Sequence, residues 1–149
     1  MKLTDMSLVC LSLYLLICVY GEELVLPISN SLGSIRLNIL SPPNLGRSRI
    51  SIIAIHGMNP MLKDEYRTSF LSQTLLNKYK YQLILPDFHS GGEEIAPGKC
   101  SYEDFNIIVE KIMSQFQDRK FVLMGKSWGG NMSVNFAVHS LTMRRSLGN

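Results

Sequence analysis

Three short apolar runs constrain the fold of this chain more than any other feature. They are RISIIAI at residues 49–55, YQLIL at 81–85 and FVLM at 121–124. Such runs, with little alternation between apolar and polar side chains, are typical of strands buried on both faces of a parallel sheet. They start about 30 to 40 residues apart, which leaves room for a crossover helix between consecutive strands. The runs therefore predict a sheet that is mostly parallel.

Helical patterns separate these runs. Apolar residues recur at helical spacing in 64–79 (Tyr66, Phe70, Leu71, Leu75, Tyr79) and in 101–117 (Phe105, Ile108, Val109, Ile112, Met113, Phe116). Ser101 and Asp104 open the second segment as a capping pair. A third helix is expected to begin at Gly129 or Gly130. Alternating strands and helices predict the α/β class, with helices on both faces of the sheet.

The segment before these runs has a different pattern. Residues 24–28 and 34–40 read as two short strands, with Gly33 between them. In SIRLNIL, residues 34–40, apolar and polar side chains alternate, which is typical of an antiparallel strand with one buried face. We expect an N-terminal antiparallel hairpin at the edge of the sheet.

The first residues resemble a secretory signal peptide. Lys2 precedes the apolar stretch SLVCLSLYLLICVY at residues 7–20, which is shorter than the roughly twenty residues of a membrane span. Val19 and Gly21 fit a cleavage after residue 21. We expect residues 1–21 to be a signal peptide and the protein to be secreted. A retained signal anchor and a buried N-terminal element are the alternatives.

Cleavage after residue 21 leaves Cys100 as the single cysteine, so no internal disulfide is expected. The net charge of +3 comes from scattered basic residues, which excludes a strong preference for nucleic acid or for an acidic membrane. No phosphate-binding glycine loop or metal-ligand cluster is present in the sequence, and no cofactor or metal is predicted.

The third apolar run leads into GKSWG at residues 125–129, a G-x-S-x-G pattern. At a sharp strand-to-helix turn, the residues two before and two after the serine crowd together, so both positions need glycine. The backbone N–H of the residue after the serine then faces the position of a developing oxyanion, at a helix N-terminus. The pattern predicts Ser127 as a nucleophile and the Trp128 N–H as an oxyanion donor.

Two other segments leave strands at the same edge, where open α/β sheets bind ligands. The first run is followed by HGMNP at residues 56–60, and the Met58 N–H is the preferred second oxyanion donor, ahead of Asn59. His56 and Gly57 are expected to make loop or substrate contacts.

The second run leads into PDFHSGG at residues 86–92. Asp87 is expected to brace this loop, and His89 is a loop residue or a substrate contact.

Together, these three segments resemble the α/β-hydrolase superfamily across residues 24–141. The resemblance implies a serine hydrolase that cleaves a small-molecule ester, thioester or amide by acyl transfer to water. It also implies Ser127 as nucleophile, with the Trp128 and Met58 amides as the oxyanion hole. The elbow and the His-Gly pair are the specific parts of the match.

The family's acid and base follow the serine in sequence, and they are missing here. After Ser127 the chain has no aspartate or glutamate, and its one histidine, His139, lies about three helical turns along the predicted helix. We therefore expect residues 22–149 to be a truncated α/β-hydrolase domain that lacks the C-terminal strands and is inactive alone. The strand before Ser127 becomes an unpaired edge, open to self-association. A non-catalytic remnant that binds a ligand or partner, and an oligomer that completes its sheet between chains with His56 or His89 as base, are the alternatives.

Overall fold

The computed structural model describes residues 20–43, 48–59, 66, 69–93 and 95–147. The predicted signal peptide therefore lies outside the described residues except for Tyr20 and Gly21, which begin the first strand. Among the helices of the described ranges, none has the length and apolar character needed to cross a membrane.

The sheet has five strands in the order β1-β2-β4-β3-β5. An antiparallel hairpin of β1 (Tyr20–Ser29) and β2 (Gly33–Ser41) occupies one edge. Strand β4 (Gln82–Asp87) pairs antiparallel with β2, and β3 (Ile50–Ile55) pairs parallel with both β4 and β5 (Lys120–Gly125). The predicted sheet with its N-terminal antiparallel hairpin is confirmed.

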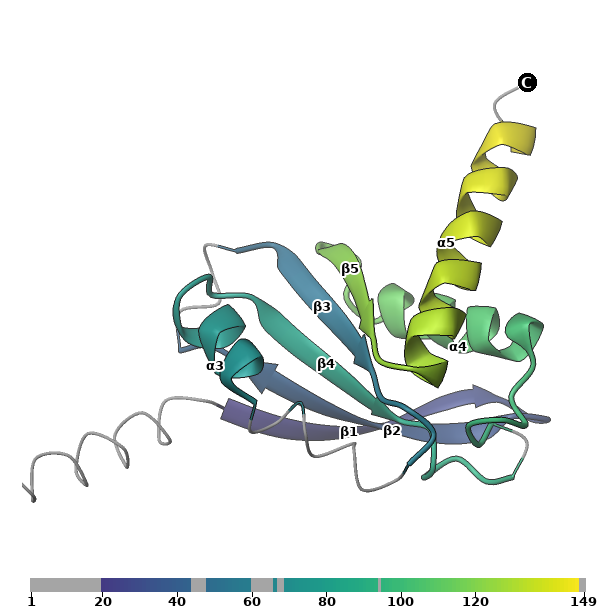
Figure 1. Cartoon of the computed structure of the whole chain (residues 1–149), viewed down its shortest axis with the longest axis horizontal. Helices are drawn as coiled ribbons and strands as arrows, with labels where there is room; N and C mark the ends of the chain where they lie inside the picture. Colours follow the sequence, from purple (N-terminus) through teal and green to yellow (C-terminus); the bar gives the residue numbers. More distant parts are fainter. Residues whose placement is uncertain (1–19, 44–47, 60–65, 67–68, 94, 148–149) are drawn as a thin grey trace, which may run out of the picture.

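Helices cover both faces of the sheet, as predicted (Figure 1). Helix α3 (Phe70–Asn77) packs on one face, and helices α4 (Tyr102–Ser114) and α5 (Trp128–Leu147) pack on the other. The side chains of β3 alternate between two cores. Ile53 belongs to the core with α4 and α5, whereas Ile52 belongs to the core with α3. This explains why β3 reads as a continuous apolar run.

Helix α4 agrees with its sequence pattern. The Ser101 side chain accepts a hydrogen bond from the Asp104 N–H at 3.1 Å and closes the first turn. The predicted positions Phe105, Ile108, Val109 and Ile112 are fully buried. The helix ends at Ser114, three residues before the predicted end.

The apolar pattern predicted around α3 is present only in part: Tyr66 and Leu75 pack against the core on this face, whereas other predicted positions do not. The described helix begins at Phe70, because the Ser69 side chain caps it by accepting from the Ser72 N–H; residues 60–65 and 67–68 lie outside the described ranges. Phe70 is 87% exposed and Leu71 is 51% exposed, and Tyr79 lies beyond the helix, whereas Leu76 is fully buried. The buried side chains of this helix of about two turns are Ser72 and Leu76, one on each turn, and only Leu76 is apolar.

A chain of polar side chains joins the amino ends of the central strands. Arg119 donates to the Ser51 hydroxyl, which donates to Gln82 at 2.7 Å, and Gln82 donates to the Ser41 hydroxyl at 3.2 Å. The Arg119 guanidinium also donates to the Ser48 and Ile50 carbonyls, each at 3.0 Å. Burial lowers the pKa of Arg119. These bonds hold β5 in register at the end opposite Ser127.

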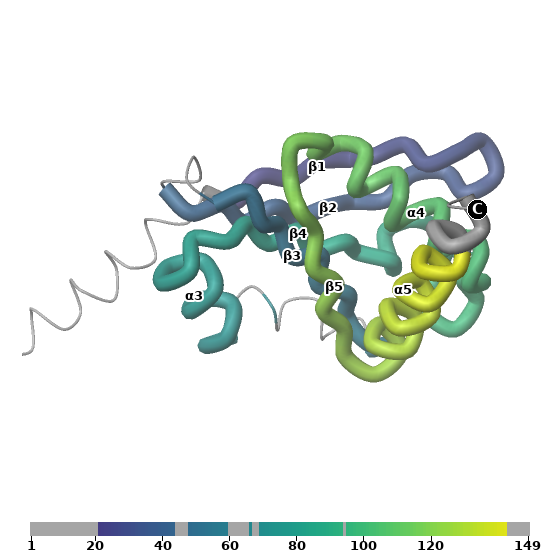
Figure 2. Tube along the Cα trace, turned by 90° about the horizontal axis from the view of Figure 1, so that it is seen from above, coloured from purple at the N-terminus to yellow at the C-terminus, as the bar shows by residue number. Residues whose placement is uncertain are grey.

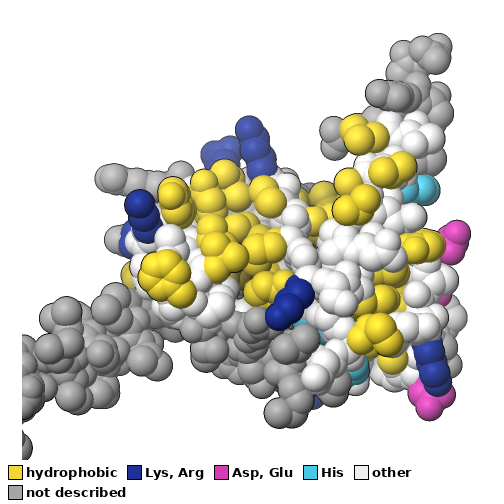
Figure 3. Space-filling model, viewed as in Figure 1, with side chains coloured by type: hydrophobic (Ala, Val, Ile, Leu, Met, Phe, Trp, Pro, Cys, Tyr) yellow, Lys and Arg dark blue, Asp and Glu magenta, His cyan; other side chains and the backbone are white. Residues whose placement is uncertain are grey.

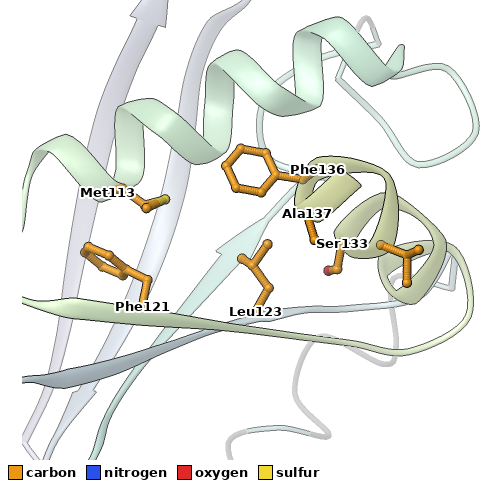
Figure 4. Close-up of a pocket in the computed structure, with 7 residues that line it drawn as sticks. Met113, Phe121, Leu123, Ser133, Phe136 and Ala137 are labelled. Carbon is orange, nitrogen blue, oxygen red and sulfur yellow. The ribbon is translucent and has the colours of Figure 1, made fainter. Parts of the chain in front are cut away.

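Strand β5 forms the edge of the sheet next to β3, as predicted. Val122 on this strand is 49% exposed. Beside it, an apolar groove of about 400 Å³ runs between β5, α4 and α5 (Figure 4). Its lining residues are Met113, Phe121, Leu123, Ser133, Val134, Phe136 and Ala137. Figure 3 shows further hydrophobic side chains gathered over α3 and the neighbouring strands, and along α5.

Candidate active site

The three loops singled out in the sequence lie together at the carboxyl ends of β3, β4 and β5. The His56 ring after β3 lies 5.1 Å from the His89 ring and 6.0 Å from the Phe88 ring, both after β4. It lies 6.4 Å from the Trp128 ring, at the start of α5. Figure 2 shows β5 leading directly into α5 at this edge.

Ser127 stands at the turn between β5 and α5 with a left-handed backbone, φ 53°. Non-glycine residues rarely adopt this conformation, and it costs free energy that the surroundings must offset. The Lys126 N–H donates to the Ile55 carbonyl at 3.2 Å and extends the ladder with β3. The Asn131 N–H donates to the Ser127 carbonyl at 3.0 Å and opens the helix. The serine is therefore held between a strand and a helix, with its side chain exposed.

Two glycines make this turn sterically possible. A methyl group on Gly125 would meet the Gly129 carbonyl oxygen at 2.3 Å. A methyl group on Gly129 would meet the carbonyl oxygens of Ile55 and His56 at 2.4 and 2.6 Å. The glycine requirement predicted from the G-x-S-x-G spacing is thus present in the structure, and Gly129 also brings α5 against the end of β3.

His56 is 2% exposed, and hydrogen bonds engage both of its ring nitrogens. The Phe88 N–H donates to Nε2 at 3.1 Å, and Nδ1 lies 2.7 Å from the Gly57 carbonyl oxygen. A backbone N–H can only donate and a carbonyl can only accept, so these bonds define the neutral tautomer with the proton on Nδ1. Through these two hydrogen bonds, His56 links the loop after β3 to the loop after β4.

Aromatic rings connect the loops to α4. The Trp128 ring packs edge-on against Phe88 at 5.2 Å and Phe105 at 6.1 Å, and Phe88 stacks on Phe105 at 5.5 Å. We name His56, Phe88, His89, Phe105 and Trp128 the aromatic cluster. No sequence pattern indicates Phe88 and Phe105 as parts of this site, because their partners lie far away along the chain.

Asp87 braces the second loop, as predicted. Its carboxylate accepts from the His89 N–H at 3.1 Å, and its carbonyl accepts from the Ser90 hydroxyl at 2.6 Å. His89 stacks on His56, and its shielded Nε2 has no hydrogen-bond partner among the described residues. The Met58 side chain is 57% exposed and reaches toward Gly98.

Cys100 is buried and unpaired. Burial raises the pKa of its thiol to about 12, and the nearby Asp104 carboxylate adds to this effect. The thiol is therefore protonated at neutral pH and is a poor nucleophile.

The structure brings Ser127 and Trp128 close to the loop of His56, Gly57 and Met58 after β3 and to His89 after β4. Among the described residues, no hydrogen bond joins a histidine ring to the serine. Within the described ranges, no hydrogen bond reaches the Ser127 hydroxyl. His139 lies on α5 twelve residues after the serine, which corresponds to roughly 18 Å along the helix. It faces solvent.

The chain belongs to the alpha/beta hydrolase fold family, which it matches over residues 50–140. No curated protein sequence matches it. The family match confirms the resemblance inferred from the three loops.

Solved structures show the same fold. An esterase of Pyrobaculum calidifontis matches with a TM-score of 0.61 at 18% identity, over 100% of this chain and 50% of its own. A proline iminopeptidase of Mycobacterium smegmatis matches with a TM-score of 0.61 at 16% identity, over 79% and 40%. An S-formylglutathione hydrolase of Staphylococcus aureus matches with a TM-score of 0.57 at 19% identity, over 82% and 53%. The chain spans about half the length of these structures.

The glycine contacts lead to a stability prediction. Replacing Gly125 or Gly129 by alanine makes the added methyl group clash with backbone atoms. Either change should lower the free energy of unfolding by about 3 kcal/mol or more. Urea denaturation measures the change. In the control Gly33→Ala, the added methyl meets nothing closer than the Gly91 carbonyl oxygen at 4.0 Å, so only the left-handed backbone of Gly33 opposes it and stability should fall by about 1 kcal/mol. Equal, small effects at all three glycines would contradict this turn geometry.

Proposed function

We propose that this chain carries the nucleophile and the oxyanion hole of a serine hydrolase that acts on a small-molecule ester, thioester or amide. Ser127 is the nucleophile, and the backbone N–H groups of Trp128 and Met58 bind the oxyanion. The observation that carries the proposal is the left-handed backbone of Ser127, φ 53°, between two sterically required glycines at the start of a helix.

In this reaction the Ser127 hydroxyl oxygen bonds to the substrate carbonyl carbon, and the carbonyl electron pair moves to oxygen. The two N–H groups stabilise the resulting oxyanion. Its collapse expels an alcohol, thiol or amine and leaves an acyl-serine, which water then hydrolyses. Because both N–H donors are oriented before the reaction, their hydrogen bonds to the developing oxyanion lower the activation free energy of acylation.

The serine proton needs an acceptor, and none is in place among the described residues. His56 holds both of its neighbours through its ring nitrogens, so accepting a proton at Nε2 breaks its bond from Phe88. We propose that a base and an acid from outside these residues complete the site. If so, the described residues do not hydrolyse substrate without that base and acid.

We also propose that residues 1–21 direct the protein into the secretory pathway and are removed. The support is the basic start, the short apolar core and the small residues before position 22. The new N-terminus of the protein secreted from cultured cells tests the cleavage: sequencing should begin at Glu22.

A cysteine in place of Ser127 tests the proposed elbow without any base. The helix N-terminus and the facing backbone N–H groups should stabilise the thiolate of Ser127→Cys, so its pKa should fall at least about 1 unit below the ordinary value of about 8.5. The rate of alkylation by iodoacetamide as a function of pH, followed by mass spectrometry of the peptide carrying residue 127, gives this pKa.

Ser114→Cys is the matched control, because the same thiol then sits at the C-terminal end of α4, where the helix does not favour an anion. Equal pKa values for the two thiols overturn the proposed elbow and favour a remnant that only binds a ligand. In the unaltered protein, a fluorophosphonate should leave Ser127 unlabelled. Labelling that disappears in Ser127→Ala would show that a base is present after all.

The free edge of β5 favours a second role, in which two copies of the chain pair through this strand. We propose such self-association because β5 bonds to β3 on one side, ends the sheet on the other and borders an apolar groove. Unpaired N–H and C=O groups along an apolar edge are a template for another strand.

A lysine on β5 should prevent this pairing. Sedimentation velocity of the unaltered protein is expected to show dimers whose fraction grows with concentration, and Val122→Lys should be monomeric, since an edge lysine cannot be buried in the pair. Ile107→Lys is the control, on the exposed face of α4, where Ile107 is 47% exposed. A protein that stays monomeric at every concentration removes the proposal.

A further inference from the structure

The peptide unit between Gly57 and Met58 carries both the carbonyl that His56 holds and the proposed oxyanion donor. In this trans peptide, the Gly57 C=O and the Met58 N–H lie in one plane and point in opposite directions. Fixing the carbonyl therefore fixes the N–H. The His56 Nδ1–H donates to that carbonyl at 2.7 Å.

We propose that His56 is a positioning residue, which orients the Met58 N–H through its hydrogen bond to the Gly57 carbonyl. The inference rests on the proposed function, in which Met58 supplies one of the two oxyanion donors. His56 is only 2% exposed, which keeps its ring away from a bound substrate. His56 therefore affects the reaction only through the Gly57–Met58 peptide, whose N–H it orients.

The ring of His56 is itself held in place. The Phe88 N–H fixes Nε2, and the Phe88 ring, which is fully buried, packs edge-on against the imidazole. The His89 ring stacks on the imidazole at an interplanar angle of 16°. A ring with these contacts cannot turn freely, so its Nδ1–H keeps a constant direction.

The same contacts tie the two proposed donors together. Trp128 packs on Phe88, and Phe88 bonds to His56, which holds the Gly57–Met58 peptide. The start of α5 also touches the His56 carbonyl, where Gly129 leaves no room for a side chain. The aromatic cluster thus fixes the distance between the two N–H groups before any substrate binds, as an oxyanion hole requires.

Two substitutions separate the two hydrogen bonds of His56. In His56→Asn, the side-chain amide lies where Nδ1 lay and keeps a donor for the Gly57 carbonyl, but nothing accepts from Phe88. In His56→Gln, the longer side chain places its amide oxygen where Nε2 lay and keeps the bond from Phe88, but no donor faces Gly57. Only the second change frees the Gly57–Met58 peptide.

Both changes are made in the Ser127→Cys protein, whose thiolate needs no base. Acylation uses p-nitrophenyl acetate: the sulfur of the introduced cysteine bonds to the carbonyl carbon, an oxyanion forms, and p-nitrophenolate leaves. Alkylation by iodoacetamide displaces iodide and forms no oxyanion. The ratio of the two rates, measured on the peptide carrying residue 127, reports the oxyanion hole apart from thiolate content, access and folding.

We expect His56→Gln to lower this ratio at least about tenfold, since a small misplacement of a catalytic donor has effects of this order or larger. His56→Asn should keep most of the ratio. In ¹⁵N spectra of the unaltered protein, the Nδ1 of His56 should carry the proton and Nε2 should not, and the Met58 amide resonance should move in the Gln variant and not in the Asn variant.

Three results overturn the inference. The inference is wrong if the ratio of the acylation rate to the alkylation rate is the same with His, Asn and Gln at position 56, and if this ratio is still higher in Ser127→Cys than in Ser114→Cys. The oxyanion hole would then exist without any contribution from His56. The inference is also wrong if Asn lowers the ratio as much as Gln. A ratio in Ser127→Cys no higher than in Ser114→Cys removes the proposed oxyanion hole itself, and the role of His56 with it.

Discussion

The contact between Gly129 and the carbonyl oxygens at the end of β3 is the constraint on which the rest of the site depends. These atoms leave no space for a side chain, so the start of α5 lies directly against Ile55 and His56. With the helix placed there and β5 bonded to β3, the chain has only the few residues of the elbow in which to reverse direction. Ser127 absorbs that reversal in a left-handed conformation. This packing therefore explains why the Ser127 side chain is exposed and why the Trp128 N–H lies at the start of the helix.

Steric requirements within a turn and the periodicity of apolar residues can be predicted from a sequence. Contacts between segments that lie far apart along the chain cannot. The glycine pair around Ser127, the parallel strands and the cap of α4 by Ser101 were predictable, because a local spacing or a continuous apolar run indicates each of them; the contact of Gly129 with Ile55 and His56 was not. The face of α3 was not fully predictable, because Ser69 starts the helix late and Leu76 is its only buried apolar residue. The partners of His56 were equally hidden, since Phe88 lies 32 residues away.

A histidine close to the proposed nucleophile, Ser127, invites assignment as its base, and the hydrogen bonds of His56 argue against that role. Both nitrogens of His56 are engaged with backbone groups that fix its tautomer. Under the proposed function, the chain separates two tasks of a hydrolase: it supplies the nucleophilic hydroxyl and the N–H donors, and among the described residues no proton acceptor contacts that hydroxyl.

In the proposed oxyanion hole, two backbone N–H groups, from Trp128 and Met58, face one oxygen position next to residue 127. A crystal structure of the Ser127→Cys protein acetylated on that cysteine tests it most directly. The account predicts the thioester carbonyl oxygen within about 3.1 Å of both backbone nitrogens, with the His56 Nδ1–Gly57 bond intact. A carbonyl oxygen that points into solvent, or a Met58 N–H turned away from it, contradicts the account.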